Sequence, residues 1–387
     1  MSIRSAAIAG AGIAGLTAAL ALAAKNIRVE IFEQTAVLSE AGAGLQLSPN
    51  ATRILDRLGL LSALEAAWIE PDFITLTSGD NLRTIATVPA GSFARKRWGA
   101  PYGVLHRATL QRVLLDAVEN HPLCRLNRGC KLTTADPAEI AAVTGMPPDL
   151  VIGADGVWSQ MRAFVPGTAL PRFSGHVAWR FMVAASDQPS FLSPDRVSAF
   201  LGARSHLVAY PLKETGGFNV VAIFHGSTSE RDWSLPAGDI GHAALLAAFL
   251  GWHPQLLSML REAAAPTLWP LYDVSDGPWQ DGRSTVLIGD AAHAMMPFAA
   301  QGAAMAIEDA FELAALVAAR PLPAALTSFE QQRRPRVAKV RARAAFNRFA
   351  YHARGPIRLG RDLVLSLRSP ESLAADFDWL YGYDSEG

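Results

Sequence analysis

The sequence predicts an α/β fold, α+β overall, in which a βαβ unit opens the chain, a mainly antiparallel sheet is inserted further along, and a helical region ends it. Three observations lead to this prediction. A buried strand, a glycine-rich turn and an uncharged helix follow one another over residues 3–25. Short alternating runs separated by turns occupy residues 173–224. A second buried strand at 284–289 is followed by a long helical pattern.

The composition is that of an ordinary globular protein. Half of the 387 residues are apolar and 18% are charged. Lys plus Arg and Asp plus Glu number 35 each, so no global charge favours a nucleic acid or a membrane surface. Cys124 and Cys130 have no ligand-like partners spaced around them, which argues against disulfides and a metal site and for a reducing compartment.

One uncharged stretch, residues 5–24, has the length of a membrane span or signal peptide. Its residues are mostly Ala and Gly, with glycines at fixed spacing, and the chain then re-enters a strand at 28–32. A buried strand and a closely packed helix account for this composition better than a targeting segment. We therefore expect a cytoplasmic protein without a membrane partner.

The N-terminal unit carries the pattern G-x-G-x-x-G. Gly10 permits the tight turn, Gly12 lets the backbone approach a pyrophosphate, and Gly15 lets the helix pack on the strand. Glu33 ends the second strand, 18 residues beyond Gly15, where an acidic side chain binds a ribose hydroxyl and disfavours a 2′-phosphate. The context predicts a Rossmann-like dinucleotide-binding unit, but the pattern alone does not separate FAD from NAD.

Further helices and strands follow from the same periodic patterns. Ser48 as N-cap, Pro49 at the first helical position and Gly59 past the end frame a helix over 49–58. The other expected strands cover 73–77, 82–87, 102–106 and 149–156, and the other expected helices cover 108–119 and 301–319. No repeat or linker separates these segments, so we expect interleaved domains.

Three motifs follow one another in a fixed order along nearly the whole chain. They are residues 10–15 with Glu33, then Asp155-Gly156, then Gly289-Asp290. With these motifs the chain resembles the single-component FAD-dependent aromatic hydroxylases, the family of p-hydroxybenzoate and salicylate hydroxylases. It looks most like the branch that acts on salicylate, 3-hydroxybenzoate and 6-hydroxynicotinate. Further segments that resemble this family are residues 42–50, 106–107, 301–302, 308–310 and 377–381.

The resemblance implies a discontinuous domain organisation. The Rossmann-like FAD-binding domain is expected to comprise residues 1–70, 100–170 and 280–325. A substrate domain, built mainly on the antiparallel sheet, is expected over 71–99 and 171–279. A C-terminal helical region is expected over 326–387.

The pattern and the resemblance together imply a set of cofactor-binding residues. Asp290 is expected at the ribityl or ribose part of FAD, and the start of the following helix is expected near the flavin ring. Arg107 is either a pyrophosphate contact or a surface arginine, and Asp155 either contacts FAD or caps a helix from about Trp158. The full set is Gly10, Gly12, Ala14, Gly15, Glu33, Gln34, Gly44, Arg107, Asp155, Asp290, Gln301, Gly302 and Ala303.

The resemblance also implies the reaction. NADH or NADPH binds transiently and reduces FAD, and a flavin hydroperoxide formed with O2 then hydroxylates a phenolic or hydroxylated heteroaromatic acid. His206 and Tyr210 share one face of a strand, at a spacing that related enzymes use in the substrate pocket, so His206 is the candidate base. The other interpretation is a histidine satisfied within the sheet. Pro297 is expected beside the flavin ring.

Two further features have competing interpretations. Arg180 is expected to pair either with a substrate carboxylate or, as the sequence favours, with an acid of the sheet. Residues 333–368 hold ten arginines and one lysine against the single acid Asp362. Because Val337, Val340, Ala344 and Phe349 are spaced nearly as on one helix face, a solvated basic face is favoured over a membrane or nucleic-acid patch.

Two other functions remain open at this point. One is a flavin-dependent halogenase or reductase on a similar fold, although the halogenase signature W-x-W-x-I-P is absent from the sequence. The other is a non-enzymatic FAD-binding regulator. The expected partners are a small aromatic substrate, O2 and NAD(P)H, for a protein that is a monomer or a homodimer. Substrate-stimulated NADH oxidation with oxygen uptake separates the three functions.

Overall fold

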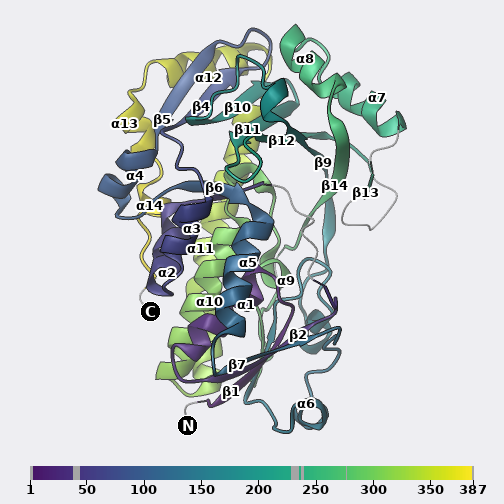
Figure 1. Cartoon of the computed structure of the whole chain (residues 1–387), viewed down its shortest axis with the longest axis vertical. Helices are drawn as coiled ribbons and strands as arrows, with labels where there is room; N and C mark the ends of the chain where they lie inside the picture. The colour runs from purple at the N-terminus through teal and green to yellow at the C-terminus, as the bar shows by residue number, and fades with distance from the viewer. Residues whose placement is uncertain (1–2, 38–43, 228–234, 237–238, 276, 386–387) are drawn as a thin grey trace.

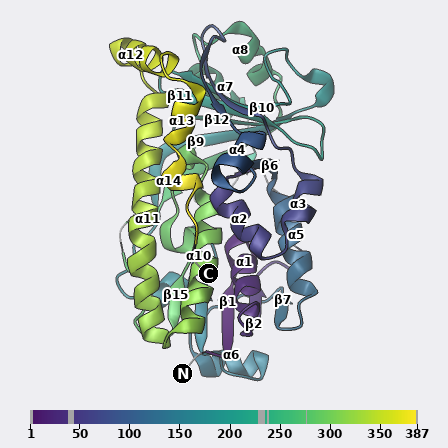
Figure 2. The ribbon, with the colours of Figure 1, turned by 90° about the vertical axis from the view of Figure 1, so that its left-hand side faces the viewer.

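The computed structural model describes residues 3–37, 44–227, 235–236, 239–275 and 277–385. The molecule is elongated, with a parallel sheet towards one end and a larger sheet towards the other (Figure 1). Two helices, α10 (Gly302–Ala319) and α11 (Leu322–Tyr351), run lengthwise between these sheets. Figure 2 shows α11 extending along most of one side of the molecule. No helix in the described ranges is both long and apolar enough to cross a bilayer.

The parallel sheet has five strands in the order β15-β8-β1-β2-β7. Every neighbouring pair in it is parallel, so the carboxyl ends of its strands share one edge. Glu33 is the last residue of one of these strands, and Gly10, Asp155 and Asp290 follow the ends of three others. This is the edge at which α/β sheets bind ligands. The strands are β1 (Ser5–Ala9), β2 (Arg28–Glu33), β7 (Cys124–Arg128), β8 (Leu150–Gly153) and β15 (Thr285–Leu287).

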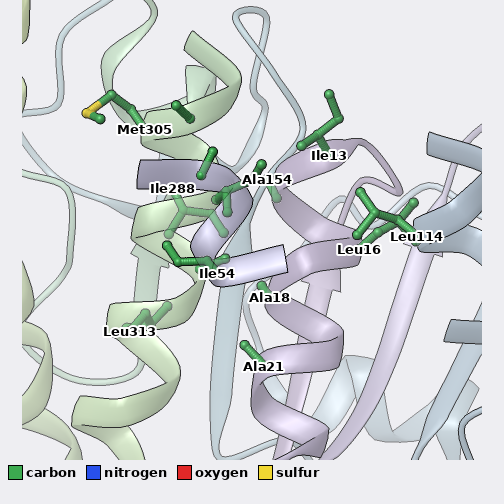
Figure 3. Close-up of a cluster of buried hydrophobic side chains, with 14 of the residues drawn as sticks. Ile13, Leu16, Ala18, Ala21, Ile54, Leu114, Ala154, Ile288, Met305 and Leu313 are labelled. Atoms are coloured by element: carbon green, nitrogen blue, oxygen red, sulfur yellow. The ribbon is translucent and has the colours of Figure 1, made fainter. Parts of the chain in front are cut away.

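Close packing of α1 (Ile13–Ala23) holds this half of the molecule together. The side of α1 with Ala18 and Ala21 faces α10 and its Leu313, whereas Leu16 points towards Leu114 (Figure 3). Leu114 lies on α5 (Arg107–Glu119). Small side chains on the side facing α10 let the two helices approach closely, which explains the Ala-rich composition without a membrane span.

The larger sheet has eight strands in the order β13-β14-β9-β12-β11-β10-β4-β5. It is antiparallel except where β10 pairs with β4 in parallel, a pairing not expected from the sequence. Helices α7 (Asp239–Ala248) and α8 (Pro254–Arg261) pack on one face, over a core that includes Trp179 and Phe249. The strands are β4 (Phe73–Ser78), β5 (Thr84–Pro89), β9 (Arg172–Val183), β10 (Arg196–Gly202), β11 (Ser205–Pro211), β12 (Phe218–His225), β13 (Leu235–Pro236) and β14 (Ala264–Asp273).

The remaining elements connect the two sheets or end the chain. Strands β3 (Gly44–Leu47) and β6 (Gly103–His106) form a small antiparallel pair. The other helices are α2 (Pro49–Arg57), α3 (Leu61–Ala67), α4 (Gly91–Trp98), α6 (Pro137–Thr144), α9 (Asp290–His293), α12 (Gly355–Ser366), α13 (Pro370–Ala375) and α14 (Asp378–Tyr381). Three short 3-10 helices are η1 (Met161–Phe164), η2 (Ala185–Asp187) and η3 (Pro297–Ala299).

The basic C-terminal segment differs from its prediction. Val337, Val340 and Ala344 are buried as expected, but Phe349 is 59% exposed. Arg333 and Arg336 are buried and do not belong to a solvated basic face. They lie on α11 and pair with acidic side chains of α10. These two positive charges therefore balance buried carboxylates and do not face solvent.

Candidate active site

The glycine-rich loop has the close packing and the open space that its sequence predicts. A Cβ on Gly15 would lie 1.9 Å from the carbonyl oxygen of Gly10, and one on Gly10 would lie 2.6 Å from that of Ala154. Gly10 also has a φ of +99°, which favours glycine. A Cβ on Gly12 would meet no atom within 4 Å. The space over Gly12, at the start of α1, is where a pyrophosphate would lie.

Glu33 holds the glycine-rich loop in place. Its Oε2 accepts a hydrogen bond from the backbone N–H of Ala11 at 2.9 Å. Its Oε1 accepts bonds from the backbone N–H and hydroxyl of Thr35, at 2.9 and 2.8 Å. A carboxylate has about four acceptor positions, so these contacts leave capacity for a ribose hydroxyl. The neighbouring Gln34 is exposed.

Asp155 caps a helix, but a later and shorter one than predicted. Its Oδ2 accepts from the backbone N–H groups of Gln160 at 2.7 Å and Met161 at 3.3 Å, at the start of η1, so the prediction of a helix from about Trp158 is wrong. The other carboxylate oxygen, Oδ1, is buried and has no partner in the described part of the chain. An orphaned acceptor of this kind fits a ligand hydroxyl.

Arg162, which sequence analysis missed, joins two of the three motifs. Its guanidinium donates to the carbonyl of Val157, just after Asp155-Gly156. It also donates to the carbonyls of Asp290 at 2.8 Å and Ala291 at 2.8 Å. The only sequence signal was its position shortly after the second motif, because nothing in the pattern indicates that this arginine is 4% exposed.

Buried charged side chains of α10 and α11 anchor the loop that ends in Asp290. Asp309 accepts from the backbone N–H of Gly289 at 2.9 Å and contacts Nε2 of His293 at 2.6 Å. Its other oxygen accepts from Nε of Arg333 at 2.8 Å. Burial opposes ionisation, but His293 and Arg333 outweigh it and lower the pKa of Asp309 to about 2. His293 thus helps to anchor the loop through Asp309.

The start of α10 separates the roles expected of three consecutive residues. The side chain of Gln301 is buried and donates to the hydroxyl of Ser48 at 2.9 Å, while its oxygen accepts from Asn50. The sequence predicted that Ser48 caps α2, but its side chain makes no cap hydrogen bond. The Ser48 hydroxyl instead donates to Asn50 Oδ1 at 2.6 Å. Gly302 has open space at its Cβ position, which leaves room for a ligand to approach the backbone at the start of α10.

These features together fit FAD. Open space lies over Gly12 and Gly302, and Asp155 retains an orphaned oxygen. Ala14 lies in the first turn of α1, and Arg107 is the first residue of α5, so both lie at the start of a helix, as an anionic group requires. Of the family-like segment 42–50, residues 42 and 43 lie outside the described residues.

The face of the eight-stranded sheet that lies opposite α7 and α8 is called the inner face here. Its side chains come from alternate residues of β9, β11, β12 and β14. Cross-strand pairing arranges them in three rows. The rows are His206-Ile223-Ala178-Trp269, then Val208-Val221-Arg180-Thr267, then Tyr210-Asn219-Met182.

His206 lies on the inner face within a cluster of rings. Its Nδ1 is 2.9 Å from Nε2 of His352, and its ring centroid is 5.1 Å from that of Phe298, next to Pro297. Burial and the nearby His352 and His176 hold the pKa of His206 well below its usual range. Burial likewise lowers the pKa of His352 to about 4. Both rings are therefore neutral near pH 7.

Tyr210 lies in the third row of the inner face, next to Gly44, the first residue of β3. A Cβ on Gly44 would lie 2.8 Å from the Tyr210 hydroxyl, so only glycine fits this contact. The backbone N–H of Gly44 donates to Asn219 Oδ1 at 2.8 Å. Burial raises the pKa of Tyr210, which keeps its hydroxyl protonated as a donor. The sequence-predicted pair His206 and Tyr210 thus shares one face, as expected from the period of two.

Arg180 contacts an aromatic ring, and no acidic side chain of the described residues pairs with it. Its Nε is buried without a hydrogen-bond partner, and its guanidinium lies 4.8 Å from the ring centroid of Trp269. Within the described ranges no Asp or Glu side chain forms an ion pair with it. The favoured interpretation, an ion pair with an acid of the sheet, is therefore wrong.

Comparison with known proteins gives one matching family model. It is described as an FAD binding domain and matches residues 4–344. The chain is 36% identical over 388 residues to a 3-amino-4-hydroxybenzoate 2-monooxygenase of Streptomyces platensis, covering 98% of this chain and 96% of that protein. It is 34% identical over 387 residues to a 3-hydroxybenzoate 6-hydroxylase of Aquipseudomonas alcaligenes, covering 98% and 97%.

The fold is also that of a solved hydroxylase. A salicylate hydroxylase in complex with its substrate superposes with a TM-score of 0.79 at 25% identity. The similarity covers 99% of this chain and 96% of that one. The parallel sheet, the inserted sheet and the C-terminal helices are therefore a shared architecture.

Proposed function

Because the chain belongs to the family of FAD-dependent aromatic-ring monooxygenases, we propose that it hydroxylates a phenolic or hydroxylated heteroaromatic acid, with NAD(P)H as electron donor and O2 as oxygen source. The named relatives act on hydroxybenzoates, which supports a substrate of this class. When bound, FAD supplies the redox chemistry, and the protein supplies binding, orientation and proton transfer.

The observation that carries the proposal is the position of His206. Its ring packs against Phe298 at 5.1 Å, and Phe298 belongs to the turn η3 that begins at Pro297 and leads into α10. The start of α10 carries the positive end of a helix dipole, which favours negative charge on a neighbouring flavin ring. A histidine at this junction lies where the inner face borders the expected cofactor site. It is therefore placed to serve a substrate held between them.

The proposed role of His206 is to accept the proton of a ring hydroxyl. Removing that proton raises electron density ortho and para to the oxygen, where hydroxylation occurs. His206 is neutral near pH 7 and so has a free lone pair on one ring nitrogen. When its Nδ1 carries a proton and donates to His352, its Nε2 is the acceptor for the substrate proton.

His352 gives the proton a route away from the site. If His206 Nε2 takes a proton, Nδ1 can pass its own to Nε2 of His352 over 2.9 Å. His352 ends α11 and is only partly buried, so its own second nitrogen can exchange with solvent. His206 is then neutral again with its proton on the other nitrogen. In the same proposal Tyr210 donates a hydrogen bond to the substrate, and Pro297 borders the flavin ring.

The proposal predicts a specific kinetic response. A halogenase would require a halide, and a reductase would not consume O2 stoichiometrically. A regulator would not turn over. Purified holoprotein should oxidise NADH or NADPH faster when a suitable aromatic acid is added, with matching oxygen uptake. A hydroxylated product at one equivalent per NAD(P)H supports the proposal, and no stimulation by any hydroxylated aromatic acid contradicts it.

A further inference from the structure

Two buried donors without acceptors lie in adjacent rows of the inner face. They are Nε of Arg180 on β9 and Nδ2 of Asn219 on the neighbouring strand β12. Val221 faces Arg180 across the two strands, and Asn219 is two residues from Val221, so both side chains project from the same side of the sheet. Neither donor is used in the proton transfer assigned to His206.

The charge on Arg180 is not balanced by the protein. Burial lowers the pKa of Arg180 to about 10, with the nearby Arg107 adding to the effect, yet the group stays protonated at neutral pH. A buried charge without a counter-ion is costly, and an anionic ligand group placed beside it would offset that cost. The guanidinium lies over the ring of Trp269, 4.8 Å from the ring centroid, and this cation–π contact supplies no counter-ion.

Asn219 is held with its donor free. Its Oδ1 accepts from the backbone N–H of Gly44 at 2.8 Å, which fixes the amide plane. Its Nδ2 is buried and finds no acceptor in the described ranges. Because the oxygen is committed, the orphaned atom is a donor, the same polarity as the Arg180 guanidinium. Two donors on one face of the sheet favour a carboxylate over a neutral group.

The spacing to His206 fits a single aromatic ring. The row that contains Arg180 is two residues along the strands from the row that contains His206, or about 7 Å, and β9 lies two strands across the sheet from β11, or about 10 Å. The two Cα atoms are therefore roughly 12 Å apart, and both side chains project from the inner face into this space. A ring with an acid group at one end and a hydroxyl at another fits between two such side chains. The acid group would lie at Arg180 while the hydroxyl meets His206.

We propose that Arg180, assisted by Asn219 Nδ2, forms the subsite that binds the carboxylate of the aromatic substrate. This inference rests on the proposed function, because it places a substrate on the inner face. It adds a requirement that the function alone does not contain: the protein must bind an aromatic acid in preference to its neutral amide.

The test measures binding to the holoprotein, without turnover. The probes are 3-hydroxybenzoate, 3-amino-4-hydroxybenzoate and salicylate, each compared with its carboxamide, and the signal is the change in the flavin absorption spectrum. The variants are R180M, R180K and N219D, with R172M as control. Arg172 is an exposed arginine at the first position of the same strand, so R172M removes an equal charge from a solvent-accessible site eight residues from Arg180.

We expect at least one acid to bind about tenfold or more tightly than its amide. R180M should weaken binding of that acid by about 10–100-fold and binding of its amide by less than about threefold, because the lost interaction is a charge-assisted hydrogen bond. R180K should restore part of the preference. N219D should weaken binding of the acid more than binding of the amide, and R172M should change neither affinity. FAD affinity should stay the same in every variant.

Four results would overturn the inference. They are equal binding of acid and amide, an acid preference that survives R180M, loss of FAD in R180M, and no spectral change with any of the acids. Loss of FAD would mean that the two donors serve the cofactor. Failure of the proposed function looks different: the acid preference and its loss in R180M would persist, but no hydroxylated product would form.

Discussion

Nδ1 of His206, on a strand of the inserted sheet, lies 2.9 Å from Nε2 of His352, at the end of the long helix α11. The two residues are 146 positions apart in the sequence, and the fold brings their rings together beside Phe298. A second histidine in contact with the first changes what His206 can do. It can receive a proton on one nitrogen while releasing one from the other.

Loss of His206 is expected to uncouple the reaction. His206→Ala should slow hydroxylation by about 10²–10⁴ because the ring hydroxyl is no longer deprotonated. NAD(P)H would still be consumed, with more hydrogen peroxide and less product per NAD(P)H. His352→Gln should give a smaller loss, because His206 remains but its proton has no histidine to move to. Product, peroxide and NAD(P)H are measured together over a pH range.

FAD content separates this outcome from simple unfolding. Both variants should retain FAD, because His206 and His352 lie outside the cradle formed by the glycine-rich loop. If His206→Ala keeps full coupling across the pH range, the histidine is structural and the base lies elsewhere.

The buried histidines should also make stability depend on pH. The pKa of His352 is about 4 in the folded protein, against an ordinary value near 6.5 in an unfolded chain. Between these values the unfolded state binds more protons, so the free energy of unfolding falls as the pH drops from about 6.5 to about 4. His352 alone contributes a slope of about 1.4 kcal/mol per pH unit.

Urea unfolding at several pH values measures that slope. His352→Gln should flatten it by about one proton, whereas His121→Gln, outside the histidine cluster, serves as the matched control. An unchanged slope in His352→Gln would show that this ring does not titrate as its burial requires.

Alanine substitutions at two glycines of one motif should affect different properties, FAD affinity at Gly12 and fold stability at Gly15. Gly12→Ala adds a methyl group to open space at a φ of −79°, so the apoprotein should keep its stability. The same methyl group would occupy the expected pyrophosphate position and weaken FAD binding. Gly15→Ala would place Cβ 1.9 Å from the oxygen of Gly10 and should destabilise the fold itself. FAD titration and urea unfolding of the apoproteins compare the two, and a Gly12→Ala variant with unaltered FAD affinity would place the phosphates elsewhere.

The ion network between α10 and α11 should be sensitive to loss of its central arginine. Arg333 pairs with Glu308 at 2.7 Å, Asp309 at 2.8 Å and Glu312 at 3.1 Å, all nearly or fully buried. Arg333→Met leaves these carboxylates unbalanced and should cost about 3–5 kcal/mol of unfolding free energy.

The next residue offers the control. Arg334 forms an ion pair with Glu330 but its side chain is 43% exposed, so Arg334→Met should cost no more than about 1 kcal/mol. Equal effects of the two substitutions in urea unfolding would contradict the assigned role of the network.

Local patterns explain why the dinucleotide-binding unit was predictable. The glycines, Glu33 and the flanking strands lie within about thirty residues, and each is required by packing that short-range periodicity reveals. The shared face of His206 and Tyr210 followed from the period of two in the same way.

Contacts between distant segments were beyond that reach. His352 meets His206 only because α11 returns along the molecule, and Arg162 bridges two motifs only because strands β8 and β15 are neighbours. Arg333 and Arg336 looked like part of a solvated basic face, since their buried acidic partners are more than twenty positions away. Arg180 was assigned an acidic partner for the opposite reason: the sequence contains many acids, and only the fold shows that none in the described ranges pairs with it.

The most direct test of the account is turnover of the holoprotein under ¹⁸O2 with NAD(P)H and the aromatic acid that binds best. Mass spectrometry of the product reports the source of the new oxygen. A monooxygenase that hydroxylates the ring must yield product with one ¹⁸O atom per NAD(P)H consumed. Product that carries oxygen from water, or peroxide without any hydroxylated product, would contradict the proposed function.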